Sequence, residues 1–330
     1  MPKKRSIYIT ALAVFFIGGL ATGWLVEAHI SNSALPQIVK QVRENAGSVL
    51  INPVLYTETT QSRSLVYNPL RKSLDTEIKT ILNNQSADSV SVYFRELNTG
   101  LWTGINEDVA YEPSSMLKVL VMLSYLRLAE TEPSILSTKL TYAVADQLGQ
   151  HYKPISIPKS GQYSVEDLIV KMITESDNIA TDSLVKANRK GFDLVYDSLQ
   201  LPPPPQEKLI DFMSPKSYSV LFRTLYNSSF LSRGISERAL LLLTQTTFTQ
   251  GLVAGVPHEI TVAHKFGEHT DIRPDGSLIS RQLHDCGIIY RPGNPYFLCV
   301  MTKGKDFSKL EKVISTISET VYKQLENNSR

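Results

Sequence analysis

A serine and a lysine three residues apart give the most direct chemical signal in this sequence. Ser115 and Lys118 stand at the start of an apolar stretch that continues to residue 128 and has the pattern of a buried helix. On a helix, side chains at this spacing share one face. Apolar surroundings lower the pKa of a lysine, so Lys118 could accept the proton of the Ser115 hydroxyl. A capping serine beside a lysine that extends its amine to solvent has the same spacing.

Two further triplets that contain polar residues follow along the chain. Ser-Asp-Asn at 176–178 lies between two stretches of helical periodicity, and Lys-Phe-Gly at 265–267 lies near the end of a predicted strand. Acyl transfer requires a nucleophile, a base, a donor to the leaving group and a cradle for the oxyanion. Together with Ser115 and Lys118, the triplets offer a candidate for each part. Taken singly, each triplet would be ordinary: a polar helix end and a solvated strand.

The three motifs resemble the signature of one superfamily. S-x-x-K, then S-D-N, then K-T-G is typical of class A β-lactamases and penicillin-binding proteins, and this chain resembles them over roughly residues 68–328. The resemblance implies an acyl-enzyme formed on a serine, with a β-lactam or a D-Ala-D-Ala-type peptidoglycan peptide as its substrate. It implies neither a metal ion nor an organic cofactor.

The resemblance gives a catalytic role to four residues. Ser115 would be the nucleophile and Lys118 the base that takes its proton. Ser176 would relay a proton to the leaving nitrogen. Lys265 would favour an anionic substrate and help to lower the pKa values at the site. A fifth residue, Asp177, would hold the turn of the second motif.

The resemblance also implies how the substrate would be bound. The side-chain amide of Asn178 would orient the acyl-amide group. The oxyanion hole would use the backbone N–H groups of Ser115 and of Glu268, the residue that follows Gly267. Preset donors of this kind stabilise a transition state by roughly 3–4 kcal/mol each.

Phe266 is a departure from the family pattern at a substrate-binding position. The family usually has a threonine or serine there, whose hydroxyl bonds the substrate carboxylate, and a phenyl ring cannot replace it. His264, His269 or Thr270 could compensate, although each also fits an ordinary surface position. The third motif therefore lacks the hydroxyl with which the family recognises a substrate carboxylate.

A second departure concerns the loop glutamate with which class A β-lactamases activate water for deacylation. Between Asn178 and Ser214 the sole glutamate is Glu207, which makes it a possible deacylation base. It lies close to the predicted helix start at Ser214, so the loop is shortened, and a solvated loop residue is the alternative. Without such a base, the acyl-enzyme would persist or pass its acyl group to an amine.

Residues 1–30 are predicted to be a membrane anchor. Lys3, Lys4 and Arg5 precede an uncharged run at 7–26, which is long enough to span a bilayer as a helix. Cations before such a run place the N-terminus in the cytoplasm and the remainder outside. A cleaved signal peptide is the alternative, and it too would export the catalytic part. The net charge of +2, without a basic patch interleaved with aromatic residues, argues against a nucleic-acid partner.

The pattern along the chain predicts an α+β fold. After the anchor, residues 31–67 have the composition of an extracytoplasmic linker, and 68–330 form the expected catalytic domain. A helix and two strands begin this domain, a helical region follows, and three strands and a helix end it. This order predicts an antiparallel sheet built from both chain ends, with helices packed on it and an inserted helical subdomain. Cys286 and Cys299 flank a turn and could form a disulfide or be two small buried residues.

We therefore expect an exported serine hydrolase of the β-lactamase or penicillin-binding type. One alternative is a non-catalytic module that binds peptidoglycan or a partner in the same groove, which Phe266 favours. Another is a generic serine esterase, because Phe266 also suits a substrate that lacks the carboxylate. The complete set of motif serines and lysines favours catalysis over a binding module.

Overall fold

The computed structural model describes residues 41–43, 49–57, 65–144, 150–202 and 211–327. Its centre is a five-stranded antiparallel sheet with the strand order β4-β3-β9-β8-β7. β3 pairs along its whole length with β9, so both ends of the domain contribute to one sheet. This confirms the predicted α+β class. The strands are β3 (Ser89–Glu96), β4 (Trp102–Ile105), β7 (Val262–Ile272), β8 (Leu278–Ile289) and β9 (Tyr296–Gly304).

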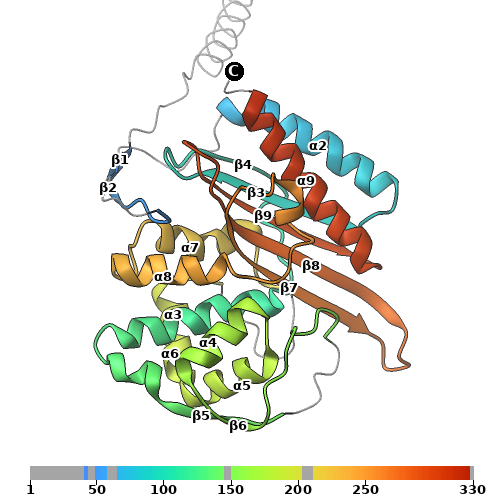
Figure 1. The fold of residues 1–330 in the computed structure, drawn as a ribbon. Helices are drawn as coiled ribbons and strands as arrows, with labels where there is room; N and C mark the ends of the chain where they lie inside the picture. Colours follow the sequence, from blue (N-terminus) through green and yellow to red (C-terminus); the bar gives the residue numbers. More distant parts are fainter. Residues whose placement is uncertain (1–40, 44–48, 58–64, 145–149, 203–210, 328–330) are drawn as a thin grey trace, which may run out of the picture. The chain divides into compact units, whose positions relative to one another are not determined.

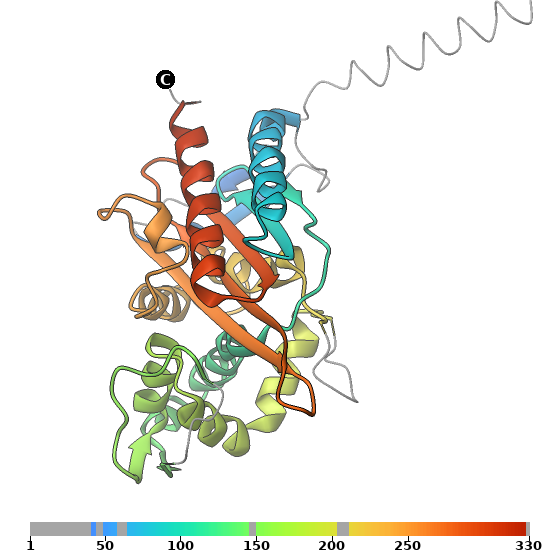
Figure 2. The same cartoon turned by 90° about the vertical axis from the view of Figure 1, so that its right-hand side faces the viewer.

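Two helices from opposite ends of the domain cover one face of the sheet. α2 (Asn68–Asn83) and α9 (Phe307–Asn327) lie side by side over it in Figures 1 and 2. Each has an apolar face at helical spacing, which is buried with the sheet residues in one core cluster. This packing leaves the opposite face of the sheet for the helical region in the middle of the chain.

The middle of the chain forms the helical part beneath the sheet in Figure 1. Its capping residues set the helix starts. Ser164 and Asp167 form a capping box before α4, and Ser214 accepts a hydrogen bond from the N–H of Ser217 before α7. The helices are α3 (Lys118–Ala129), α4 (Val165–Thr174), α5 (Asn178–Ala187), α6 (Arg189–Ser198), α7 (Pro215–Tyr226) and α8 (Arg233–Leu243).

Short elements connect these larger ones. Two small antiparallel pairs are present, β1 (Gln41–Arg43) with β2 (Val54–Thr57) and β5 (Lys139–Tyr142) with β6 (Gly161–Ser164). The 3₁₀ helices are η1 (Leu65–Tyr67), η2 (Ser114–Leu117), η3 (Pro133–Ser137) and η4 (Val253–Gly255). Of these, η2 contains Ser115 of the first motif and leads directly into α3.

Part of the predicted linker at 31–67 packs against the domain. Leu50 and Ile51 are buried in the same core cluster as the helical region. The backbone N–H of Asn52 donates to the carbonyl oxygen of Tyr226 at 2.9 Å, and the Tyr290 hydroxyl donates to the carbonyl of Leu50 at 3.0 Å. The packed chain therefore begins before residue 68 in this segment.

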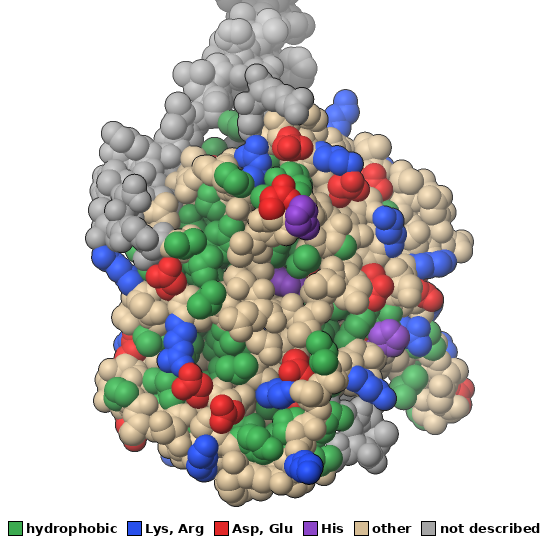
Figure 3. Space-filling model, in the orientation of Figure 1, with side chains coloured by type: hydrophobic (Ala, Val, Ile, Leu, Met, Phe, Trp, Pro, Cys, Tyr) green, Lys and Arg blue, Asp and Glu red, His purple; other side chains and the backbone are tan. Residues whose placement is uncertain are grey.

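The predicted membrane anchor at 7–26 lies outside the described residues. Within the described part of the chain, no helix combines the length and the apolar character that crossing a bilayer requires. The surface seen in Figure 3 mixes basic and acidic side chains, and the described residues on that face form no continuous patch of one sign.

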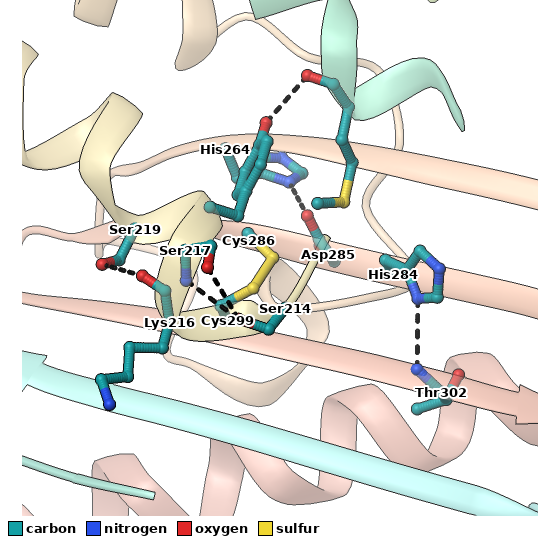
Figure 4. Close-up of a disulfide and its surroundings, with 12 residues drawn as sticks. Ser214, Lys216, Ser217, Ser219, His264, His284, Asp285, Cys286, Cys299 and Thr302 are labelled. Atoms are coloured by element: carbon teal, nitrogen blue, oxygen red, sulfur yellow. Dashed lines mark hydrogen bonds and ion pairs between the residues drawn. A yellow bond between two sulfur atoms is a disulfide. The ribbon is translucent and has the colours of Figure 1, made fainter. Parts of the chain in front are cut away.

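Cys286 and Cys299 form a disulfide that links β8 to β9. The two residues are directly opposite each other in the strand register, and both are fully buried. Figure 4 shows the disulfide beside two polar contacts of the same sheet. His264 Nδ1 lies 2.8 Å from Asp285 Oδ1. His284, which precedes Asp285 in β8, accepts a hydrogen bond from the backbone N–H of Thr302. The sequence allowed either a disulfide or two unlinked buried cysteines, and the structure contains the disulfide.

Candidate active site

The serine of the first motif stands on a strained turn. Ser114, the residue before Ser115, has a φ of +46°, which is unfavourable for a residue with a side chain. The turn is closed by a hydrogen bond from the N–H of Met116 to the carbonyl of Pro113 at 3.0 Å. Ser115 then lies at the N-terminal end of η2 and α3, where backbone N–H groups lack intrahelical partners. Local strain of this kind is typical of functional sites.

The second motif is held by its central aspartate. Asp177 Oδ1 accepts hydrogen bonds from the N–H groups of Ile179 and Ala180 at 2.8 and 3.0 Å, which caps α5. Its other oxygen accepts from the hydroxyl of Tyr142 at 2.8 Å. Ser176 precedes it with a φ of +57° and is fully buried. Asp177 thus fixes the turn that presents its two neighbours, the position expected for a structural residue.

Two lysines meet at the hydroxyl of Ser176. Lys118 Nζ and Lys265 Nζ each donate to Ser176 Oγ at 3.0 Å. Lys118 also donates to the carbonyl oxygen of Ser176 at 2.6 Å and to Asn178 Oδ1 at 2.7 Å. Lys265 also donates to the carbonyl of Phe266 at 3.1 Å. The structure therefore brings residues of all three motifs into direct contact.

Burial lowers the pKa of both amines. Lys118 and Lys265 are almost completely buried, and desolvation disfavours the charged form. The pKa of Lys118 is held well below its usual value by burial first and by the positive charge of Lys265 second. Burial lowers the pKa of Lys265 to about 7, against the opposing influence of Asp285 and Glu268. A neutral amine, the form that accepts a proton, is therefore accessible near neutral pH.

Ser115 and Lys118 line a cavity of about 600 Å³, which is within the usual range for a small-molecule site. Asn178, Glu268 and Thr270 contribute to its wall. No hydrogen bond joins Ser115 to Lys118 within the described part of the chain, since the amine donates to the second motif instead. The predicted serine–lysine pair thus shares the cavity but is not in direct hydrogen-bond contact.

Gly267 allows the third motif to approach the turn that precedes Ser115. A Cβ atom added at Gly267 would lie 2.5 Å from the carbonyl oxygen of Pro113 and 2.9 Å from Cγ of Met116. Both distances are far below van der Waals contact, so only glycine permits this spacing. The glycine therefore sets the distance between β7 and η2.

Phe266 lies away from the cavity, contrary to its expected place among the substrate-binding residues. It is 3% exposed and packs with the aromatic rings of Phe248 and Tyr152 at centroid distances of 4.3 and 5.5 Å. It does not line the cavity that contains Ser115. The reason is the alternation of side chains along β7, which directs Phe266 into the core beneath α9. Its ring fills the core instead of replacing the lost hydroxyl.

Glu268 occupies an edge strand, which leaves its backbone free on the cavity side. The hydrogen bond from the N–H of Tyr290 to the carbonyl of Thr261 fixes the register, and alternation along an antiparallel pair then directs the N–H of Glu268 away from β8. Its carboxylate accepts from the N–H groups of His151 and Tyr152 at 3.0 and 2.9 Å. The N–H is thus available to an oxyanion, and the side chain positions a loop.

Two residues of the site were not foreseen from the motifs. Gln150 donates to the carbonyl oxygen of Ser176 at 3.2 Å and accepts from Asn178 Nδ2 at 3.2 Å, so it supports the second motif. Glu112 contributes a buried carboxyl group to the cavity wall. Its place three residues before Ser115 is the only sequence signal that could have identified it. The predicted deacylation base Glu207 lies outside the described residues.

The match to a family model covers most of the chain. Residues 73–325 match the model of the β-lactamase enzyme family. No curated protein sequence matches the chain. The matched range includes all three motifs and every strand of the central sheet.

Solved structures of similar fold include both penicillin-binding proteins and β-lactamases. A variant of PBP-A, in an acyl-enzyme complex with penicillin G, has a TM-score of 0.63 and 20% identity over 78% of this chain and 97% of its own. The TLA-3 extended-spectrum β-lactamase has a TM-score of 0.66 and 21% identity over 77% and 98%.

A β-lactamase from Chitinophaga pinensis has a TM-score of 0.65 and 19% identity, over 78% of this chain and 100% of its own. At these identities the likeness of the structures establishes a shared fold, and the family match adds the sequence relationship. The two findings agree with each other and with the order of the three motifs. The chain therefore belongs to the β-lactamase enzyme family, and it shares the fold of class A β-lactamases and of PBP-A.

Proposed function

We propose that the chain forms an acyl-enzyme on Ser115 with β-lactams or with D-Ala-D-Ala-type amides of the cell wall. The observation that supports this most strongly is the meeting of Lys118 and Lys265 at Ser176 Oγ, next to the cavity that Ser115 lines. Two buried amines around one hydroxyl destabilise a fold, and such arrangements are typical of proton-transfer sites. The penicillin G acyl-enzyme of the similar PBP-A structure is consistent with this substrate class.

The geometry supports a specific route for the protons during acylation. Lys118 accepts the proton of Ser115 as Oγ attacks the carbonyl carbon of the amide. When the C–N bond breaks, Ser176 Oγ protonates the leaving nitrogen, and Lys118 returns a proton to Ser176 through the hydrogen bond between them. The backbone N–H groups of Ser115 and Glu268 stabilise the oxyanion.

The test is the mass of the intact protein after incubation with penicillin G. The expected result is an increase equal to one penicillin molecule, absent in Ser115→Ala, or penicillin consumption that likewise depends on Ser115. An unchanged fold in the variant, checked by circular dichroism, makes the comparison valid. If neither an adduct nor penicillin loss is observed with the wild-type protein, the β-lactam assignment is wrong.

A generic esterase is the second candidate, and the position of Phe266 favours it. The ring is buried in an aromatic cluster, so the third motif offers the cavity no hydroxyl for a substrate carboxylate. Hydrolysis of a chromogenic ester that depends on Ser115 and resists inhibition by penicillin G would support the esterase. Inhibition by penicillin G would assign both activities to one acyl-enzyme site.

We further propose that the domain is exported and held at the membrane by residues 7–26. The cations before this apolar run and the disulfide between Cys286 and Cys299 support an oxidising compartment outside the cytoplasm. Protease added to cells whose wall and any outer membrane have been removed, but whose cytoplasmic membrane is intact, should digest the domain. Protection of the domain until the cells are lysed would contradict export.

A further inference from the structure

Glu112 places a buried carboxyl group in the wall of the cavity. Its side chain is 3% exposed and lines the cavity together with Ser115 and Lys118. Oε1 accepts a hydrogen bond from the N–H of Ser114 at 3.1 Å. Oε2 is buried and has no hydrogen-bond partner among the described residues. Buried carboxyl oxygens normally have donors, so this one is an exception at the site itself.

The backbone of Glu112 is fixed on both sides. Its N–H donates to Gln282 Oε1 at 3.1 Å, and its carbonyl oxygen lies 3.1 Å from His284 Nε2. The other ring nitrogen of His284 accepts from the N–H of Thr302, so Nε2 must be the donor to Glu112 (Figure 4 shows the contact with Thr302). Burial lowers the pKa of His284 to about 4 and keeps the ring neutral. The carboxyl group is therefore held in a rigid setting.

The surroundings of Glu112 strengthen it as a base. Burial raises the pKa of its carboxyl group. The titratable groups that face it are Asp211, which raises this pKa, and His269 and Asp271 of β7, which act in opposite directions. A carboxylate whose pKa is closer to the working pH is a more effective general base.

Two other charged groups of the cavity wall, Lys118 and Glu268, have hydrogen-bond partners already. Lys118 donates to Ser176 and Asn178. Both carboxylate oxygens of Glu268 accept hydrogen bonds from backbone N–H groups. Of the two carboxyl groups that line the cavity in the described structure, Glu112 is thus the one with an oxygen that lacks a hydrogen-bond partner.

We propose that Glu112 is the general base of deacylation. Oε2 accepts a proton from a water molecule as the water oxygen attacks the acyl carbonyl carbon on Ser115. The tetrahedral oxyanion then collapses and the bond between that carbon and Ser115 Oγ breaks. Glu112 passes the proton to Oγ, which restores both groups and releases the acid. The inference rests on the proposed function, because it requires an acyl-enzyme on Ser115.

The test separates acylation from deacylation in Glu112→Gln. Glutamine keeps an oxygen for the N–H of Ser114 but cannot accept a proton from water. Acyl-enzyme formed with penicillin G is freed of excess drug, and its decay is followed by intact-protein mass. The adduct of the variant should form within about threefold of the wild-type rate and decay at least about 100-fold more slowly, the lower range for loss of a general base.

Two further variants control for structure. Glu107→Gln removes another buried glutamate, outside the cavity, and should leave both rates unchanged. Glu112→Asp keeps a carboxylate and should recover part of the decay rate. The wild-type decay rate should fall with decreasing pH as Glu112 becomes protonated, whereas the residual decay of Glu112→Gln should lack this dependence.

Several outcomes would overturn the inference. Equal decay in wild type and Glu112→Gln would show that another group activates water. A wild-type adduct that does not decay would support the acyl-enzyme on Ser115, but it would show that no residue, Glu112 included, acts as a deacylation base. Acylation slowed as much as decay would indicate that Glu112 only supports the Ser114 turn or binds substrate. Absence of an adduct and of penicillin loss in wild type would overturn the proposed function itself.

Discussion

The amine of Lys265 lies in the most enclosed part of the site, and its environment has a measurable effect on folding. In the unfolded chain this lysine keeps its proton up to about pH 10.5, whereas the folded protein releases it near pH 7. Between these values the unfolded state binds more protons, so the free energy of unfolding rises with pH. The maximum slope for one such group is about 1.4 kcal/mol per pH unit.

Lys265→Met should therefore reduce the pH dependence of stability between pH 7 and 9. Relative to wild type, the slope should fall by about 1 kcal/mol per pH unit, since methionine carries no proton and fits an apolar interior. Urea unfolding at pH 7, 8 and 9 measures this. Lys79→Met, on an exposed part of α2, should leave the slope unchanged. Parallel curves for wild type and Lys265→Met would contradict the assignment.

At the scale of residues, the motifs were predictable and their neighbours were not. Ser115, Lys118, Ser176 and Lys265 were identified because their order and spacing match a known signature, and the structure brings the second motif to both lysines. Glu112 became visible only through its burial and its unpartnered oxygen. Those properties depend on tertiary contacts with β8, which no local pattern encodes.

At the scale of elements, the contact between β7 and η2 depends on a single missing side chain. Gly267→Ala would drive a methyl group against the carbonyl oxygen of Pro113 and Met116 Cγ. We expect β7 to shift away from the turn and the free energy of unfolding to fall by about 1–3 kcal/mol. The rate of acylation should also fall, because the shift moves the third motif away from Ser115. Urea unfolding and the rate of adduct formation with penicillin G measure the two effects.

A second glycine provides the matched control. Gly234 lies in α8 with no atom within 4 Å of an added Cβ. Gly234→Ala should stabilise the protein by up to about 1 kcal/mol, because alanine has the higher helix propensity, and should leave acylation unchanged. Equal effects of the two substitutions on stability and acylation would contradict the role assigned to the close approach at Gly267.

Elements were predicted best where local chemistry decides them. The capping box at Ser164 and the cap at Ser214 are readable because side chains a few residues apart satisfy the helix ends. Phe266 shows the limit. Its type marked a departure from the motif, but its direction depends on the register of β7 against β8. The residue was therefore expected in the binding site and lies in the core.

At the scale of the whole molecule, the disulfide should contribute to stability by restricting the unfolded chain. Cys286 and Cys299 are 13 residues apart, and closing a loop of this size is worth about 3 kcal/mol in the chain-entropy model. The double variant Cys286→Ala, Cys299→Ala should lose about this much in urea unfolding. A reductant should destabilise the wild type and leave the variant unaffected. Equal stability of wild type and variant would contradict this.

The architecture of the whole domain was predictable because strand and helix patterns at the two ends of the chain are clear. The order of elements suggested one sheet from both ends, and the pairing of β3 with β9 confirms it. The packing of Leu50 and Ile51 against the domain was not predicted, because the apolar residues at 49–56 are interrupted by Asn52 and Pro53 and follow neither a helical nor a strand period.

The pairing of β3 with β9 also has a consequence for biosynthesis. Residues 89–96 obtain their partner strand only when residues 296–304 have been made, about two hundred positions later. Lys265 and Glu268 join the site through the same sheet. In a chain that is still emerging from the ribosome, or is cut short before its last strand, this sheet is incomplete. The three motifs can therefore meet in the arrangement described above only after residues 296–304 have been made.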